Sequence, residues 1–289
     1  MRTIKENQPL SQLSTLGTGG VAEFFASPES LEELQEILRF YAGKCPVYVI
    51  GGGSNIIIPD GNIKGLTIST RNLKSINWLG NFTAEIQSGF SLPLLLKTIR
   101  GRNSGGLEFA AGIPGTIGGA VAGNAGAGGK GICDFVDEVR ALDSAGNLRI
   151  YRRSEFDYGY RRCSISDEGV IIVSVLMTFR ESRAEDEKEF SDFMTRRKNQ
   201  PLNSRSAGCT FKNPEGYSAG KLLDECGCKG LCVGDAVVSD IHANFILNRG
   251  KASSSDVLRL IEICASKVYG DMGIKLEPEI KTLSPCFCV

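Results

Sequence analysis

The spacing of hydrophobic residues predicts helices in five parts of the chain. In residues 31–41 apolar side chains recur every three or four positions, and Ser30 stands where a helix N-cap is expected. The same pattern indicates helices at 92–102, 218–226 and 254–269. Residues 182–197 are strongly charged but still helical in pattern, with a modest apolar face made of Phe190, Phe193 and Met194.

Short apolar runs between turn residues predict strands along the rest of the chain. They fall at 21–26, 47–50, 56–58, 66–68, 76–78, 83–87, 136–143, 148–151, 170–180, near 233 and 245, and at 275–283. The first elements alternate strand, helix and strand, which indicates an α/β unit, and the next are strands joined by turns. The change of composition at 182–197 favours a domain boundary there, so we expect one domain at 1–195 and a second at 196–289.

Glycine is concentrated in two stretches that interrupt this pattern. Residues 51–55 read Gly-Gly-Gly-Ser-Asn directly after a predicted strand, and 110–131 contains an unusually large share of the chain's 35 glycines. Such density indicates backbone that approaches a ligand closely or turns through positive φ. Ala120, Val121 and Ala122 predict a short buried helix entered at Pro114, whose free N–H groups suit a phosphate. The alternative is a tightly packed glycine segment with no ligand.

Neither stretch matches the two commonest nucleotide-binding motifs. A dinucleotide fingerprint requires a helix after the glycines, whereas Gly53 is followed by a second predicted strand. A Walker A loop requires glycine at 124 and serine or threonine at 131, where this chain has Asn124 and Gly131.

Charge and cysteine content exclude several classes of protein. The 289 residues include 33 basic and 33 acidic side chains, so the balance of charge gives no indication of nucleic acid or an anionic membrane as partner. Ten unevenly spaced cysteines are typical of reduced thiols rather than of a disulfide scaffold. The start of the chain lacks a signal-peptide core, and no apolar run is long enough to span a bilayer. We therefore expect a cytoplasmic protein.

Three segments carry side chains suited to catalysis, each with a plainer interpretation. Cys209 lies in a loop of small residues, 204–214, and can exchange a proton, or it is a buried structural cysteine. Arg161 follows Tyr160 in a turn and can clamp a carboxylate or phosphate, or it is solvated. Glu279 lies near the C-terminus on one strand face with Glu277, where surface carboxylates are common.

The remaining polar motifs point away from metal and lipid sites. His242 is the only histidine, which excludes a histidine-rich metal site, and we interpret it as a structural hydrogen-bonding residue at the start of a strand. Cys226, Cys228 and Cys232 do not have the spacing of a usual zinc site, so we expect no metal. The terminal Cys-Phe-Cys-Val, 286–289, matches a prenylation box only formally.

Taken together and in order, these segments resemble a known family. The matching parts are Thr15 to Gly20, 51–55, 112–127, Tyr160-Arg161, 206–214, 242–245 and 276–280. They resemble UDP-N-acetylenolpyruvoylglucosamine reductases, the flavoenzymes of bacterial peptidoglycan precursor synthesis. The chain departs from the usual pattern at Gly17 and Thr18, and it has cysteine in place of the commoner serine at 209. It shows no extra tyrosine-bearing insertion between 170 and 198, so it resembles the compact subtype.

The resemblance implies an α+β fold. It would consist of a two-part FAD-binding domain of the vanillyl-alcohol-oxidase (PCMH) type, with parts at about 1–70 and 71–195, followed by a smaller α+β substrate-binding domain. FAD would be held without a covalent bond. The residues implied to contact it are Gly51, Gly52, Gly53, Ser54, Asn55, Gly112, Pro114, Gly115, Thr116, Gly118, Gly119, Asn124, Ala125 and Gly126.

The resemblance also implies a mechanism and partners. Arg161, Cys209 and Glu279 would be catalytic, with Cys209 as proton donor, and Asn213, Lys198 and Tyr160 would contact the substrate. NADPH would reduce the flavin, which would then reduce the enolpyruvyl UDP-sugar in a monomeric cell-wall enzyme needed for cell shape and division. Two alternatives stay open, namely another FAD-dependent oxidase or dehydrogenase with the same flavin-binding fold, and a nucleotide-binding protein without catalysis.

Overall fold

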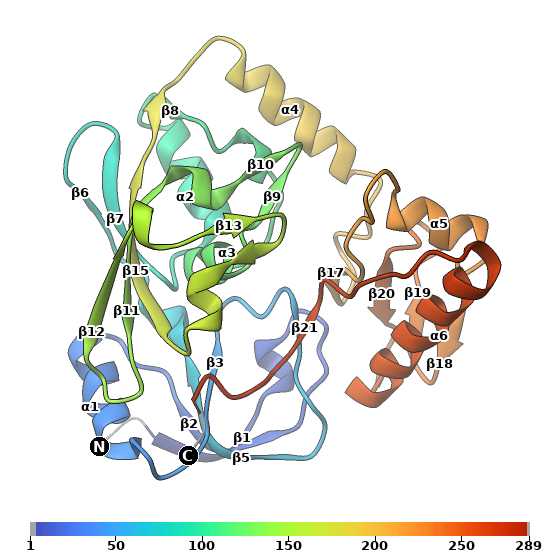
Figure 1. Ribbon diagram of the computed structural model, residues 1–289, viewed down its shortest axis with the longest axis horizontal. Coiled ribbons are helices and arrows are strands. Elements are labelled where there is room, and N and C mark those ends of the chain that lie inside the picture. Colours follow the sequence, from blue (N-terminus) through green and yellow to red (C-terminus); the bar gives the residue numbers. More distant parts are fainter. Residues whose placement is uncertain (1–3, 288–289) are drawn as a thin grey trace.

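The computed structural model describes residues 4–287, which form two bodies joined by helix α4 (Asp186–Arg197) (Figure 1). The larger body contains two sheets, and the smaller one contains a third sheet with helices α5 (Ala219–Glu225) and α6 (Ser254–Met272). None of the helices in 4–287 is both long enough and apolar enough to cross a membrane.

The first sheet has the strand order β1 (Ile4–Pro9), β2 (Val21–Ala26), β5 (Asn62–Ser69) and β3 (Val47–Ile50). Strands β2 and β3 both run parallel to β5, while β1 is antiparallel to β2. Helix α1 (Leu31–Tyr41) packs Leu34, Ile37 and Leu38 into this body, and Ser30 caps it by accepting a hydrogen bond from the Glu33 N–H at 3.2 Å. The predicted α/β unit and its N-cap are therefore confirmed.

The second sheet is antiparallel and has five strands. Their order is β12 (Leu148–Arg152), β11 (Val136–Leu142), β15 (Ile171–Thr178), β7 (Thr83–Gln87) and β6 (Ile76–Trp78). Helices α2 (Leu92–Arg100) and α3 (Ile117–Ala122) contribute their apolar faces to the same core as strands β7, β11 and β15. This core fixes the ends of the glycine-rich segment 110–131.

The third sheet forms the smaller body. Its order is β17 (Ser206–Cys209), β20 (Phe245–Asn248), β19 (Ala236–Val238) and β18 (Cys232–Val233), and its core includes apolar residues of α5 and α6. Two-residue strands complete the fold: β4 (Ile56–Ile57), β8 (Ser104–Gly105), β9 (Gly126–Ala127), β10 (Lys130–Gly131), β13 (Tyr158–Gly159), β14 (Arg162–Cys163), β16 (Arg180–Glu181) and β21 (Lys281–Thr282). Short 3-10 helices lie at Ser11–Leu13, Thr70–Asn72, Glu108–Ala110, Ile132–Phe135, Arg153–Glu155 and Ser164–Asp167.

The end of the chain returns from the smaller body to the larger one. Strand β21 pairs in parallel with β4, and the Cys286 N–H donates to the Val47 carbonyl oxygen at 2.7 Å. Figure 1 shows this segment crossing between the two bodies. The division of the chain at residue 195 stays a prediction, and the structure adds this second connection to the one made by α4.

Several predicted elements need correction. Only Lys281–Thr282 of the predicted strand 275–283 joins a ladder, because the segment passes between the bodies and Pro278 lacks an N–H donor. The predicted loop at 204–214 contains β17. His242 lies in the turn before β20 rather than at the start of a strand. Its Nδ1 accepts a hydrogen bond from the Asn244 N–H at 3.2 Å.

Asp60 links the larger body to the first turn of α6. Its carboxylate accepts hydrogen bonds from the N–H groups of Ser254 and Ser255, both at 2.9 Å, and from the Ser255 hydroxyl at 2.8 Å. Burial alone would raise the pKa of Asp60, but these hydrogen bonds outweigh it and lower the pKa. An anion is favourable at a helix N-terminus, so this contact stabilises both α6 and its junction with the larger body.

We expect Asp60→Ala to lower the free energy of unfolding by about 1–2 kcal/mol at pH 7, as for the loss of a helix cap. A carboxylate with a depressed pKa stabilises the fold above its unfolded pKa of about 3.9 and loses that contribution as pH falls. Urea unfolding at pH 7 and pH 3 should therefore show a difference from wild type at pH 7 that shrinks at pH 3. Asp192→Ala, at an exposed position on α4, is the control. Equal stability of wild type and Asp60→Ala at pH 7 would contradict the prediction.

Candidate active site

A cleft of about 410 Å³ is lined by residues from both bodies. The larger body contributes the two glycine-rich segments, 51–55 and 112–125, and the turn that carries Arg161. The end of α4, strand β17 and the returning segment 279–281 contribute further lining residues. The cleft thus brings together the glycine stretches and the catalytic candidates that the sequence placed far apart.

The two glycine segments approach each other more closely than residues with side chains could. A Cβ on Gly52 would lie 2.7 Å from the Gly115 Cα, and one on Gly115 would lie 2.8 Å from the Ser54 Oγ. Gly115 also has φ of +118°, which disfavours any other residue. The Thr116 hydroxyl is buried at the cleft and has no hydrogen-bond partner within the described chain. Exposed backbone and an unused hydroxyl in a concave site fit a bound cofactor.

Arg71 holds the first glycine segment in place from behind. Its Nε donates to the Gly51 carbonyl at 3.0 Å, and its Nη2 donates to the carbonyls of Leu13 and Gly52 at 2.7 and 2.9 Å. Three carbonyl oxygens are therefore turned toward one guanidinium. This arrangement fixes the shape of the loop before any ligand binds.

Most of the residues predicted to contact the cofactor line the cleft. These are Gly51, Gly52, Gly53, Ser54, Asn55, Gly112, Pro114, Gly115, Thr116, Gly119 and Ala125. Gly118, Asn124 and Gly126 do not. The Asn124 side chain instead bonds to the Gly159 carbonyl and the Cys133 N–H, and the Gly126 carbonyl accepts from Arg161.

The expectation of free N–H groups at the start of the short helix is wrong for its first two residues. Helix α3 begins at Ile117, with Thr116 as N-cap. The N–H groups of Ile117 and Gly118 donate to the carbonyls of Phe90 and Ser88 at 2.9 and 2.8 Å. They are satisfied by the loop before α2, because that loop packs against the start of α3.

Gly52→Ala is expected to weaken FAD binding about tenfold or more, because overpacking costs about 1–3 kcal/mol. The added methyl group would lie 2.7 Å from the Gly115 Cα and 3.0 Å from the Thr116 N, and these are backbone atoms that cannot move alone. Fluorescence titration of the apoprotein with FAD measures the effect. Gly80→Ala is the control, since a Cβ there meets no heavy atom within 4 Å. Affinity within twofold of wild type for Gly52→Ala would contradict the prediction.

Arg161 and Glu279 form an ion pair in the cleft, with 2.6 Å between Nε and Oε1. The Nε–H is not directed at this oxygen, so the contact is chiefly electrostatic. Nη1 of Arg161 donates to the Gly126 carbonyl at 2.9 Å. Arg161 has φ of +56°, which is unfavourable for a residue other than glycine. Strained backbone of this kind is typical of functional sites. Glu279 is held by its backbone, whose N–H donates to the Thr210 carbonyl at 2.8 Å.

Cys209 ends strand β17 and lines the same cleft. Burial raises the pKa of its thiol to about 11, and the charge of Glu279 acts in the same direction, while Arg161 and Arg197 oppose it. Burial likewise raises the pKa of Glu279, opposed by Arg161 and Lys212. The thiol therefore keeps its proton at neutral pH, and Glu279 holds a proton more readily than an exposed carboxyl does.

Tyr160 and Asn213, two of the predicted substrate residues, line a second cavity of about 290 Å³ together with Lys212, Pro214, Glu215, Lys275 and Glu277. The Asn213 N–H donates to the Tyr160 hydroxyl oxygen at 3.3 Å, and the Asn213 side chain accepts from the Ala219 N–H at the start of α5. Lys198 lines neither cavity, because it follows the last turn of α4 with its side chain exposed.

Sequence reasoning missed Arg197, Gln200 and Lys281, which line the cleft. Arg197 ends the charged run 182–197, whose composition indicated a helix with a modest apolar face and a domain boundary rather than a site residue. The signal that identifies it is its spacing, since it lies seven residues after Phe190 and three after Met194, on the apolar face of α4. A cation on the apolar face of a helix points toward the body of the protein, and Arg197 lines the cleft there.

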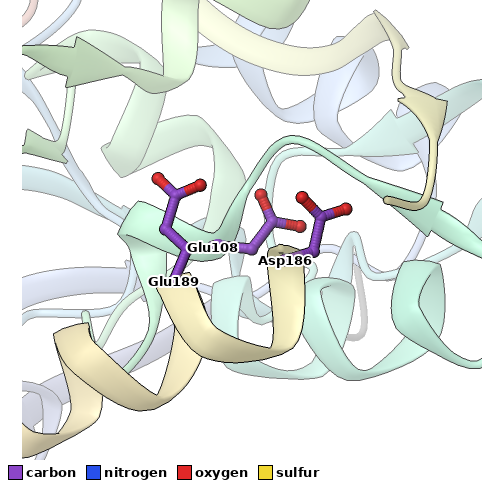
Figure 2. A group of neighbouring side chains, drawn as sticks. All are labelled: Glu108, Asp186 and Glu189. Atoms are coloured by element: carbon purple, nitrogen blue, oxygen red, sulfur yellow. The ribbon is translucent and has the colours of Figure 1, made fainter. Parts of the chain in front are cut away.

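The structure also shows where side chains that could bind a metal lie close together. In residues 4–287, ligand atoms of three acidic side chains gather within 4.8 Å at Glu108, Asp186 and Glu189 (Figure 2). The group does not include Cys226, Cys228, Cys232 or His242. Arg180 forms ion pairs with Asp186 and Glu108 at 2.6 and 3.4 Å, so this acidic group anchors the start of α4. Cys288 and Val289 of the terminal motif lie outside the described residues.

Each of the two bodies matches a known protein family model. Residues 22–151 match the model of an FAD binding domain, and residues 200–283 match the model described as UDP-N-acetylenolpyruvoylglucosamine reductase, C-terminal domain. The predicted α+β fold, an FAD-binding domain followed by a smaller α+β domain, is therefore confirmed. The fold and the cleft define a two-domain flavoprotein of the oxidoreductase class.

The family follows from whole-chain similarity. The chain is 41% identical over 284 residues to UDP-N-acetylenolpyruvoylglucosamine reductase of Syntrophomonas wolfei, covering 97% of this chain and 95% of the relative. It is 38% identical over 283 residues to the enzyme of that name from Clostridioides difficile, covering 97% and 93%. The crystal structure of the Thermus caldophilus reductase superposes with a TM-score of 0.83 at 34% identity, covering 98% of this chain and all of that one. The chain belongs to the UDP-N-acetylenolpyruvoylglucosamine reductase family.

Proposed function

We propose that the protein uses FAD and NADPH to reduce UDP-N-acetylglucosamine enolpyruvate to UDP-N-acetylmuramate, a step of peptidoglycan precursor synthesis in the cytoplasm. The observation that carries this proposal is the meeting of Arg161, Cys209 and Glu279 in one glycine-lined cleft. Family membership supports the substrate, since relatives across the whole chain bear that enzyme name. The protein would act as a monomer on small molecules, without nucleic acid or membrane as partner.

The cleft residues fit FAD without a covalent bond. The segments 51–55 and 112–116 would hold its diphosphate and neighbouring groups, with the Thr116 hydroxyl available as a hydrogen-bonding partner. Bound FAD supplies the hydride that adds to the β-carbon of the enol ether, after NADPH has delivered it and left. The backbone spacing at Gly52 and Gly115, too tight for a side chain, allows the close approach that such a cofactor needs.

The side chains of the cleft would complete the reduction. Hydride addition to the β-carbon builds negative charge at the α-carbon and its carboxylate, and the guanidinium of Arg161 would stabilise this charge where it develops. Cys209 would donate its proton to the α-carbon, so that one hydride and one proton together give the lactyl ether. Water would then reprotonate the thiolate. Glu279 would orient Arg161 through their ion pair.

Asn213 and Tyr160 would contact the sugar nucleotide from the adjacent cavity. Lys198 is the weakest of the proposed substrate contacts, because its side chain lies outside both cavities.

The test is one NADPH oxidation assay with and without the enolpyruvyl UDP-sugar, on protein whose flavin absorbance has been recorded. We expect a yellow protein, slow NADPH oxidation alone and fast oxidation with the sugar nucleotide. An FAD oxidase or dehydrogenase with another substrate would give no stimulation by the sugar nucleotide. A non-catalytic binding protein would not oxidise NADPH, and protein that cannot be loaded with flavin would refute the proposal.

A further inference from the structure

Arg197 presents a half-buried guanidinium to the cleft from the last turn of α4. Its Nε donates to the Ala111 carbonyl at 2.5 Å, and its Nη1 donates to the Gln200 side chain at 3.4 Å. Gly112 leaves room for its stem, since a Cβ there would lie 2.5 Å from the Arg197 Cδ. Two hydrogen bonds therefore hold the side chain without any bound ligand, and Gly112 leaves the space that its stem occupies.

This guanidinium has no ionic partner in residues 4–287. The other arginine of the cleft, Arg161, pairs with Glu279, and Arg180 at the opposite end of α4 pairs with Asp186. Arg197 is held only by neutral oxygens, and an arginine side chain keeps its charge in proteins. A half-buried cation without a counter-charge has lost part of its hydration, so its place in the cleft suits an anion supplied by a ligand.

The attachments of Arg197 place this charge on the cofactor side of the reacting region. It is tied to Ala111 and Gly112, where the second glycine segment begins. Both Arg161 and Arg197 lower the pKa of the Cys209 thiol, so both charges lie near the sulfur. Arg161 lies next to the proposed substrate cavity, because the residue before it, Tyr160, lines that cavity and accepts a hydrogen bond from the Asn213 N–H. Hydride and proton must reach adjacent carbons, so a flavin ring bound in this cleft would lie near Cys209, and Arg197 lines the same cleft.

We propose that Arg197 provides the positive charge that stabilises the reduced isoalloxazine ring of FAD and so raises its reduction potential. This inference rests on the FAD-binding part of the proposed function. A ring that has accepted a hydride carries one more negative charge than before. A fixed cation in a site shielded from water lowers the free energy of that charge far more than water would.

The test measures the two-electron midpoint potential of FAD-loaded protein by equilibration with a redox dye at pH 7, without NADPH or sugar nucleotide. We expect Arg197→Met and Arg197→Gln to disfavour reduction about a hundredfold, which corresponds to a potential about 60 mV more negative. Arg197→Lys, which keeps the charge, should retain most of the wild-type potential. Arg196→Met is the matched control, because Arg196 is the exposed neighbour on the same turn; its potential should match wild type.

Three results would overturn the inference. One is a shift of less than about 10 mV in both neutral variants, roughly a twofold change in the equilibrium constant. Another is a shift in Arg197→Lys as large as in Arg197→Met, because the charge would then not be the cause. The third is loss of FAD from both neutral variants while Arg196→Met keeps it, which would assign the charge to the cofactor's phosphates. Wild-type protein that holds no flavin would instead refute the proposed function, so the two failures are distinguishable.

Discussion

Cys209→Ala is expected to lower turnover of the enolpyruvyl substrate by about 10³-fold, within the range typical of general acid catalysis. The thiol lines the cleft with a pKa raised to about 11, so it carries its proton throughout the neutral range. Its removal leaves no thiol to protonate the α-carbon, whereas reduction of FAD by NADPH needs no proton from it. Stopped-flow absorbance of the flavin separates the two half-reactions, and we expect only the second to slow.

Cys232→Ala is the matched control, since Cys232 is exposed on β18 and does not line the cleft. It should behave as wild type in both half-reactions. Equal slowing of both half-reactions by Cys209→Ala would give the thiol a role other than proton donor. Wild-type turnover in that variant would remove it from the mechanism.

The local elements of the fold could be predicted because they depend on neighbouring residues. Ser30 caps α1 as its sequence position indicates, and the apolar face of that helix packs as its spacing requires. The segment around Pro278 could not be predicted in the same way. Its alternating side chains are typical of a strand, but its hydrogen bonds depend on where the two bodies stand relative to each other. Information of that kind is not contained in any local window of sequence.

The candidate site likewise combines features that the sequence predicts with features that depend on long-range contacts. Arg161, Cys209 and Glu279 were selected from the sequence by resemblance, and the sequence alone offered a plain alternative for each. Their meeting depends on two long-range hydrogen bonds, from the Glu279 N–H to Thr210 and from Arg161 to Gly126. Arg197 was missed because it ends a strongly charged run in which no single cation stands out, although its spacing places it on the apolar face of α4. Lys198, which directly follows this run, was chosen by resemblance, but its side chain is exposed and does not line the cleft.

Arg161→Ala is expected to lower turnover of the enolpyruvyl substrate by about 10²–10³-fold, as for the loss of one group that stabilises a developing anion. The ion pair with Glu279 shows that the guanidinium is fixed before substrate arrives, so the charge does not have to be reorganised during the reaction. Alanine, like arginine, carries a Cβ, so the substitution leaves the cost of the φ of +56° nearly unchanged. The loss should therefore reflect charge rather than backbone strain.

The Arg161 variant should also change how the site responds to pH. Arg161 lowers the pKa of Glu279 against the effect of burial, so its removal raises that pKa further. Where kcat/KM falls at low pH because Glu279 takes up a proton, that fall should begin at a higher pH in the variant. A pH profile of kcat/KM measures this shift. Arg162→Ala, at the exposed neighbouring residue, should change neither rate nor profile. Normal turnover in Arg161→Ala would remove Arg161 from the catalytic set, because no other described cation of the cleft forms an ion pair with Glu279.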